Sequence, residues 1–89
     1  MRSTRRAGGT DAALSATDNA LLDRLKAWRL AEARAQAVPA FVILHDRTLA
    51  EIARQRPDGI AAIAGIAGIG AKKLERYGPA LLELVARDR

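Results

Sequence analysis

The sequence contains no cysteine, and this absence limits the chemistry that the chain can carry. Neither a disulfide framework nor a zinc site built on thiolates can form. One histidine and the lack of a tight carboxylate cluster also argue against a metal site. We therefore expect no cofactor. Without cysteine, a reducing, cytoplasmic setting is the default expectation.

Long apolar runs are also missing. The longest apolar stretches, such as Gly59 to Ile69, are much shorter than the roughly 20 residues that cross a bilayer. Residues 1–17 carry Arg2, Arg5 and Arg6 but no apolar segment of the kind found in a signal peptide. We expect no membrane association.

Aromatic residues are scarce, with one Trp, one Tyr and one Phe, although 49% of the 89 residues are hydrophobic. The core must therefore consist mainly of Ala, Leu, Ile and Val. β-Branched and aromatic residues are too sparse for alternating strands. This composition predicts an all-α fold, a compact orthogonal bundle of about five short helices, in one domain that is a monomer.

The chain divides into two regions by composition. Residues 1–17 are rich in Gly, Ser, Thr, Ala and Arg and show no periodicity, which predicts a flexible basic linker or tail. Residues 18–89 are predicted to form the helical domain. Its first helix should begin at Asp18, a good N-cap, and run to about Ala37. Trp28 falls on the apolar stripe of this helix, which favours a core position over a base-stacking one.

Prolines and glycines mark the remaining elements. Val38-Pro39 ends the first helix, and a short helix containing Phe41 to Leu44 should be buried on most sides. Asp46 and Asp58 are predicted to cap the third and fourth helices. The last helix should begin near Gly70 or Ala71 and be kinked or interrupted at Gly78-Pro79.

Few residues suggest catalysis. Asp46 is explained as a cap, Asp23 lies on a polar helix face, and His45 has no Ser or Cys partner in a supporting motif. The glycine segment lacks a Ser or Thr after Lys72 or Lys73, and no strand precedes it, which excludes a nucleotide-hydrolysis loop. We expect that the chain is not an enzyme by itself.

The net charge of +5 and the segment Gly68-Ile69-Gly70 point to a polyanionic partner. Lys72 and Lys73 would lie in the first turn of a helix, where free backbone N–H groups can hold a phosphate without reading sequence. A tight helix-to-helix turn needs the same glycines, and a basic surface can be merely solvated. Both alternatives stay open.

Three blocks of residues resemble the HRDC domain, the helicase and RNase D C-terminal module. They are Leu22-x-x-Leu25-x-x-Trp28-Arg29, then Val38 to Ala53, then Gly68 to Gly78. The resemblance covers about Asp18 to Ala86. The last block is most similar to the domain of RecQ-type helicases, whereas UvrD-like helicases and ribonuclease D are alternative hosts.

The resemblance implies a five-helix module that binds single-stranded or partly duplex DNA weakly and tunes substrate choice in its host. In RecQ-type members an aromatic residue after the Val-Pro element contributes to single-strand binding. Its match here is Phe41, where bacterial relatives often have Tyr. Within its apolar run, Phe41 could equally be a core residue.

Two hypotheses follow. The first is an auxiliary nucleic-acid-binding module, with salt-sensitive affinity in the micromolar range or weaker. The second is a module that docks onto other domains of the host helicase or onto a partner protein, without binding DNA. For the first, the candidate contacts are Phe41, Lys72, Lys73, Arg76, Arg34 and Arg47. As part of a bacterial helicase, the domain would associate with the nucleoid.

Overall fold

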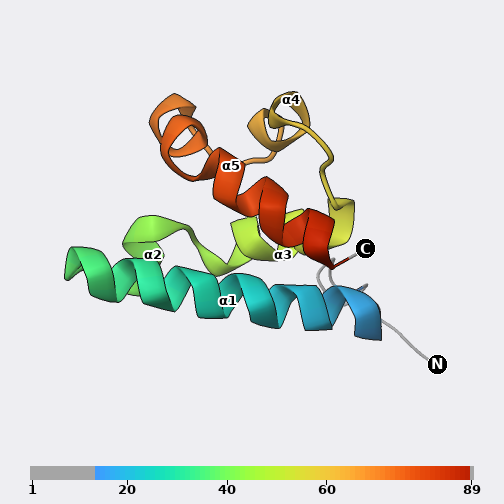
Figure 1. The fold of residues 1–89 in the computed structure, drawn as a ribbon, viewed down its shortest axis with the longest axis horizontal. Helices are drawn as coiled ribbons and strands as arrows, with labels where there is room; N and C mark the ends of the chain where they lie inside the picture. Colours follow the sequence, from blue (N-terminus) through green and yellow to red (C-terminus); the bar gives the residue numbers. More distant parts are fainter. Residues whose placement is uncertain (1–13, 89) are drawn as a thin grey trace.

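A computed structural model describes residues 14–88, which contain helices and no strand. Helix α1 is the longest, and it contacts α2, α3 and α5, while α4 packs on α5 (Figure 1). The all-α, five-helix prediction is confirmed for this part of the chain. The flexible character predicted for residues 1–17 concerns mainly positions outside the described residues. The helices are α1 (Ala16–Gln36), α2 (Ala40–Ile43), α3 (Asp46–Gln55), α4 (Ile60–Ala64) and α5 (Ala71–Arg87).

The start of α1 lies two residues before the predicted one. Ser15 is the N-cap, and its hydroxyl oxygen accepts a hydrogen bond from the backbone N–H of Asp18 at 3.0 Å. Ser and Asp are comparable caps, and the prediction that Asp18 is the cap is wrong. Asp18 instead lies in the first turn, where its charge suits the positive end of the helix.

The prediction that α2 is buried on most sides is wrong. Phe41 is 60% exposed and Val42 is 44% exposed, whereas Ile43 and Leu44 are buried. A four-residue helix that packs on α1 buries one side only. The predicted caps are wrong as well, because His45 and Gly59 occupy the N-cap positions of α3 and α4.

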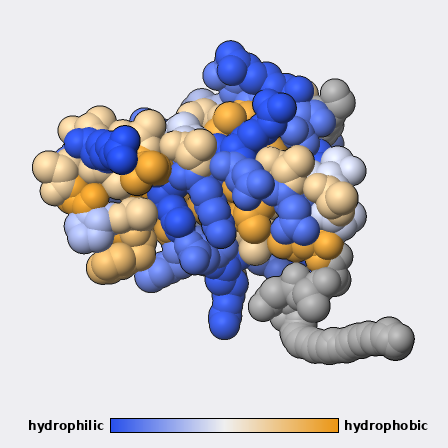
Figure 2. Space-filling view, turned by 90° about the horizontal axis from the view of Figure 1, so that it is seen from below, coloured by the Kyte–Doolittle hydropathy of each residue, from blue (hydrophilic) through white to orange (hydrophobic). Residues whose placement is uncertain are grey.

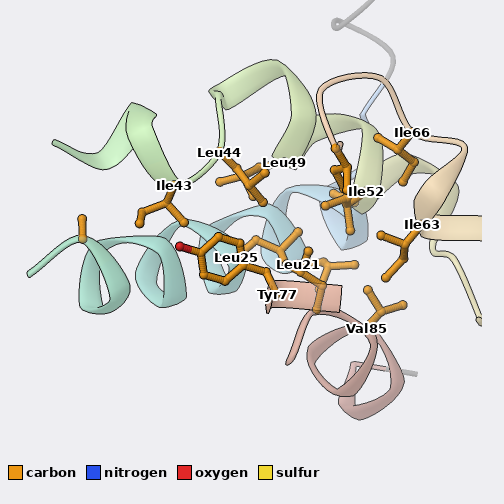
Figure 3. Close-up of a cluster of buried hydrophobic side chains, with 14 residues drawn as sticks. Leu21, Leu25, Ile43, Leu44, Leu49, Ile52, Ile63, Ile66, Tyr77 and Val85 are labelled. Atoms are coloured by element: carbon orange, nitrogen blue, oxygen red, sulfur yellow. The ribbon is translucent and has the colours of Figure 1, made fainter. Parts of the chain in front are cut away.

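The core is aliphatic, as the composition predicts, and draws on every helix (Figure 3). Trp28 is half-buried and packs edge-on against Tyr77, with ring centroids 5.4 Å apart and planes at 82°. Its predicted packing role is confirmed. The fully buried large side chains are Leu21, Leu25, Ile43, Leu44, Leu49, Ile52, Ile63, Leu81 and Val85.

Helix α5 runs without interruption through Gly78-Pro79. Of the two predicted alternatives, interruption is therefore wrong, whereas the change of direction in the ribbon of α5 agrees with a kink (Figure 1). Gly78 is buried against α4, and a Cβ there would lie 3.1 Å from Cδ1 of Ile60. The glycine thus permits close packing of α4 on α5, which favours a continuous helix despite the proline.

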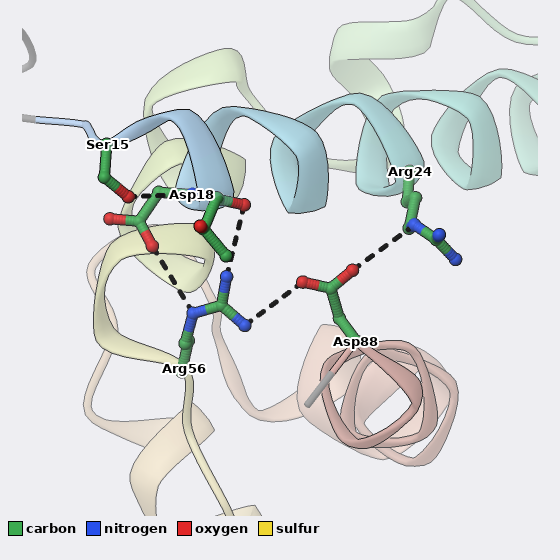
Figure 4. Close-up of polar contacts among 6 residues, drawn as sticks. Ser15, Asp18, Arg24, Arg56 and Asp88 are labelled. Atoms are coloured by element: carbon green, nitrogen blue, oxygen red, sulfur yellow. Dashed lines mark hydrogen bonds and ion pairs between the residues drawn. The ribbon is translucent and has the colours of Figure 1, made fainter.

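Arg56 joins the ends of three helices (Figure 4). It follows α3 in the left-handed conformation, with φ of 47°. Its guanidinium contacts the carboxylates of Asp18 at 3.3 Å and Asp88 at 3.2 Å, and donates a hydrogen bond to the Thr17 carbonyl. Asp88 also pairs with Arg24 of α1. The network therefore links the start of α1, the end of α3 and the end of α5.

Arg29 joins α1 to the junction between α2 and α3. It donates a hydrogen bond to the Leu44 carbonyl at 2.9 Å and pairs with the Asp46 carboxylate at 2.6 Å. The Arg29 side chain is buried, whereas that of Asp46 is largely exposed. The hydrogen bond from Arg29, together with its charge, lowers the pKa of Asp46 below its ordinary value of 3.8.

The turn before α5 requires glycine at one position only. Gly68 has φ of 96°, and a Cβ there would collide with Oγ1 of Thr48, whereas Gly70 has φ of −84° and open space around it. The Thr48 hydroxyl donates a hydrogen bond to the Ala67 carbonyl at 3.2 Å. This contact fastens the turn to the first turn of α3.

Replacement of Arg56 by Met should destabilise the domain by about 1–3 kcal/mol, because two largely buried carboxylates, those of Asp18 and Asp88, lose a cationic partner. Met keeps a flexible apolar side chain of similar length, and it must adopt the same left-handed backbone conformation as Arg56. Arg54→Met on α3 is the matched control; its pair with Glu51 is partly exposed, so the cost should stay below about 0.5 kcal/mol. Urea unfolding of both variants measures the difference, and equal losses would refute the role of the network.

Gly68→Ala should cost about 2–3 kcal/mol, because alanine combines an unfavourable φ with a collision against Thr48. Gly70→Ala should cost less than about 1 kcal/mol, because its backbone conformation is ordinary and its surroundings are open. Thermal unfolding of the two variants tests this. A Gly68 variant as stable as the Gly70 variant would show that the turn tolerates a side chain.

The contribution of the Arg29–Asp46 pair to stability should depend on pH in the acid range. Since the pKa of Asp46 is lowered in the folded state, its stabilisation is present above about pH 4 and is lost as the pH falls through the folded pKa. Asp46→Asn should therefore be less stable than the unmodified chain near neutral pH, with the difference vanishing toward about pH 3. Urea unfolding across this range measures it. Asp23→Asn, on an exposed residue of α1, is the control, and a pH-independent difference for Asp46→Asn would contradict the prediction.

Candidate nucleic-acid interface

The exposed Phe41 ring does not stand alone. It stacks on the exposed His45 imidazole, with centroids 6.2 Å apart and planes at 20°. Ile43 and Leu44, between the two, are buried and hold this segment on the core. The structure thus places two flat rings together at the surface. Sequence reasoning treated His45 as a surface residue without a role and missed this pair.

His45 also lines a shallow pocket of about 390 Å³ that connects the start of α3 with the glycine turn. Arg47 lines the same pocket, and its exposed side chain makes no salt bridge with any residue that the structure describes. Ala67 and Gly68 contribute the turn. A cation, a ring and a backbone turn therefore share one surface, which suits contact with a phosphate and a base.

Lys72 and Lys73 lie in the first turn of α5, directly after Gly70. Lys72 is exposed and Lys73 is half-buried. The first N–H groups of a helix have no acceptor within it, and that end is positive. The two lysines therefore add to a positive region that begins at the glycine turn.

Arg76 is one turn further along α5 and on the same face as Lys72, because residues four apart are neighbours on a helix. Its guanidinium carbon lies 5.7 Å from the centre of the Tyr77 ring. The Tyr77 hydroxyl accepts a hydrogen bond from the Gln36 amide at 2.9 Å. Arg76 therefore extends the basic face from the glycine turn toward the end of α1.

The structure does not bring Arg34 into this group. Arg34 is exposed and lies nine residues after the fully buried Leu25, which places it about half a revolution around α1 from the core. Of the six residues proposed from sequence, Phe41 and Arg47 share the surface at the start of α3. Lys72, Lys73 and Arg76 lie on α5, after the glycine turn.

Apolar side chains are also exposed on α1 and α2. Figure 2 shows mostly hydrophobic colours at the end of the molecule where α1 ends and α2 lies (left), and mainly hydrophilic ones across the middle. Val42 and Leu30 are 44% and 46% exposed. An exposed apolar surface of this kind is typical of sites that contact another molecule.

Two further features of the described residues bear on function. No group of three or more His, Asp or Glu residues among positions 14–88 is arranged to hold a metal ion. No helix in this range is both long and apolar enough to span a bilayer.

Comparison with known proteins identifies relatives among DNA helicases. The ATP-dependent DNA helicase UvrD2 of Mycobacterium tuberculosis is 52% identical over 68 residues, which are 76% of this chain and 10% of that protein. The ATP-dependent DNA helicase RecQ of Pasteurella multocida is 30% identical over 77 residues, which are 86% of this chain and 12% of that protein. The RecQ helicase of Bacillus subtilis is 35% identical over 72 residues, which are 81% of this chain and 12% of that protein. The chain thus spans about a tenth of the length of these relatives.

The sequence profile of the HRDC domain matches residues 18–85. This range holds all but the first two residues of α1, and it ends two residues before the end of α5. The family resemblance and the helical fold predicted from the sequence are both confirmed. The chain belongs to the HRDC domain family.

Proposed function

We propose that this chain is an auxiliary nucleic-acid-binding module of a DNA helicase. The observation that carries the proposal is the stacked pair of Phe41 and His45 beside Arg47 and the glycine turn. An exposed flat ring offers a face on which any base can stack, and a neighbouring guanidinium can neutralise a phosphate. The module would therefore bind single-stranded or partly duplex DNA without reading its sequence.

Binding at this surface should be weak and sensitive to salt. Stacking contributes about 1–3 kcal/mol per base, and the surface offers one ring pair. The remaining attraction comes from a few cations, Arg47 and the basic residues of α5, which act by releasing counterions. A surface of this size suits the tuning of substrate choice, whereas more extensive binding along a DNA strand, and catalysis, would reside in other domains of the host.

The relatives support a helicase as the host. Identity to the UvrD2 helicase, at 52%, exceeds that to the RecQ helicases, at 30–35%. A UvrD2-type host is therefore favoured over a RecQ-type one. ATP hydrolysis and strand separation would be performed elsewhere in that larger protein, and the chain would perform no catalysis by itself.

The proposal predicts that Phe41→Ala weakens binding of a short oligothymidylate about tenfold, through loss of stacking. Arg47→Gln should weaken binding and lower the slope of log affinity against log salt by about 0.7. Fluorescence anisotropy at several salt concentrations measures both effects. Leu30→Ala removes a comparably exposed apolar side chain from α1, and Arg87→Gln removes a cation from the opposite end of α5. Both controls should bind normally, and absence of binding even at low salt would refute the proposal.

A second candidate is favoured by the apolar surface around Phe41 and Val42, which suits docking onto another domain of the host helicase. The two candidates differ in their dependence on salt. Docking through apolar contacts would shift the amide signals of Val42 and Leu30 on addition of the remaining host domains, with little effect of salt. Nucleic-acid binding would shift those of His45, Arg47 and the glycine turn, and would weaken as salt rises.

A further inference from the structure

We propose that the groove between α1 and α3 binds an acidic segment of a partner protein that inserts a large apolar side chain. This surface is distinct from the stacked rings, and the proposal does not rest on nucleic-acid binding. The groove has a volume of about 280 Å³. Its lining combines three apolar residues with five charged ones, namely Leu14, Leu22, Ala50, Lys26, Asp46, Arg47, Glu51 and Arg54.

The charge of the groove is positive once the ion pairs of its two carboxylates, one of them with Arg29 outside the lining, are taken into account. Asp46 is neutralised by Arg29, at 2.6 Å, and Glu51 is neutralised by Arg54. Lys26 and Arg47 remain, and neither forms a salt bridge with a residue that the structure describes. Two such cations beside apolar side chains complement a ligand that carries carboxylates next to an apolar group.

A peptide fits this groove better than a nucleic acid does. No aromatic side chain lines it, so a base would find no stacking partner. Aliphatic side chains from Leu22 and Leu14 instead suit contact with a Leu or Phe side chain, which is how apolar anchors of protein interfaces are held.

The preceding segment of this chain is a poor occupant. Residues 1–13 contain Arg2, Arg5 and Arg6 against a single carboxylate, Asp11. Their net charge is positive, like that of the groove, so this segment and the groove would repel one another. Charge complementarity therefore favours an acidic segment from a different protein.

The test is an NMR titration of the whole chain with a short peptide of alternating Asp and Leu with a central Phe. A matched peptide with Lys in place of Asp, and an oligothymidylate, serve as comparison ligands. The acidic peptide should shift the amides of Leu22, Lys26 and Ala50 to saturation, and the basic peptide should not. Equal shifts with both peptides, absence of saturable shifts, or larger shifts at these amides with the oligonucleotide would each overturn the proposal.

Charge reversal at Lys26 provides the second part of the test. Lys26→Glu should weaken binding of the acidic peptide at least about fivefold. Arg34→Glu makes the same charge change on the same helix outside the groove lining, and it should change affinity less than about twofold. Equal weakening by both variants would show attraction to the overall charge and would overturn the groove assignment. Lys26 is exposed, and a retained amide spectrum verifies that each variant is folded.

Discussion

Packing against α1 is the constraint on which the rest of the structure depends. Its buried stripe, Leu21, Leu25 and Ala33, is shared by the other contacting helices, because α2, α3 and α5 all touch this one helix. In a core with almost no aromatic rings, stability must come from many close aliphatic contacts. Small residues permit such contacts: Ala33 is buried on the side of α1 that faces the core, and Gly78 lets α4 approach α5. The positions of the candidate binding side chains follow from these contacts, since Phe41, Arg47 and Lys72 each belong to a helix or turn that is held by the same core.

Two arginines supplement this packing, one at the start of α1 and one further along it. Arg56, at the end of α3, binds the start of α1 and the end of α5. Arg29, on α1, binds the junction between α2 and α3. Short helices such as α2 cannot be stable by themselves. Arg29 therefore bears on the proposed binding surface, because the carbonyl that it binds, that of Leu44, immediately precedes His45. The orientation of the stacked rings depends on a buried guanidinium on a different helix.

Much of the fold could be predicted from the sequence, because the relevant signals are local. The positions of proline and glycine predicted five helices. The apolar stripe of the first helix predicted that Trp28 packs against the core. The errors arose where two residues satisfied the same rule, as with Ser15 and Asp18, or where tertiary contacts decided, as at Gly78-Pro79. The site was harder to predict. Phe41 and His45 are four residues apart, but Leu44 between them is extended, so no helical periodicity indicates that the rings stack. Whether Arg34 shares a face with Lys72 likewise depends on the packing of α1 and α5, which the sequence does not reveal.

Arg47 connects the two surfaces of this domain. It lines the pocket with His45 and the glycine turn, and it also lines the groove between α1 and α3. One guanidinium cannot neutralise a phosphate on one side and a peptide carboxylate on the other at full strength. Two ligands that both use Arg47 would therefore oppose one another, and by thermodynamic reciprocity each would weaken the other to the same degree. The constraint arises from the first turn of α3, which projects one long basic side chain into the lining of both the pocket and the groove.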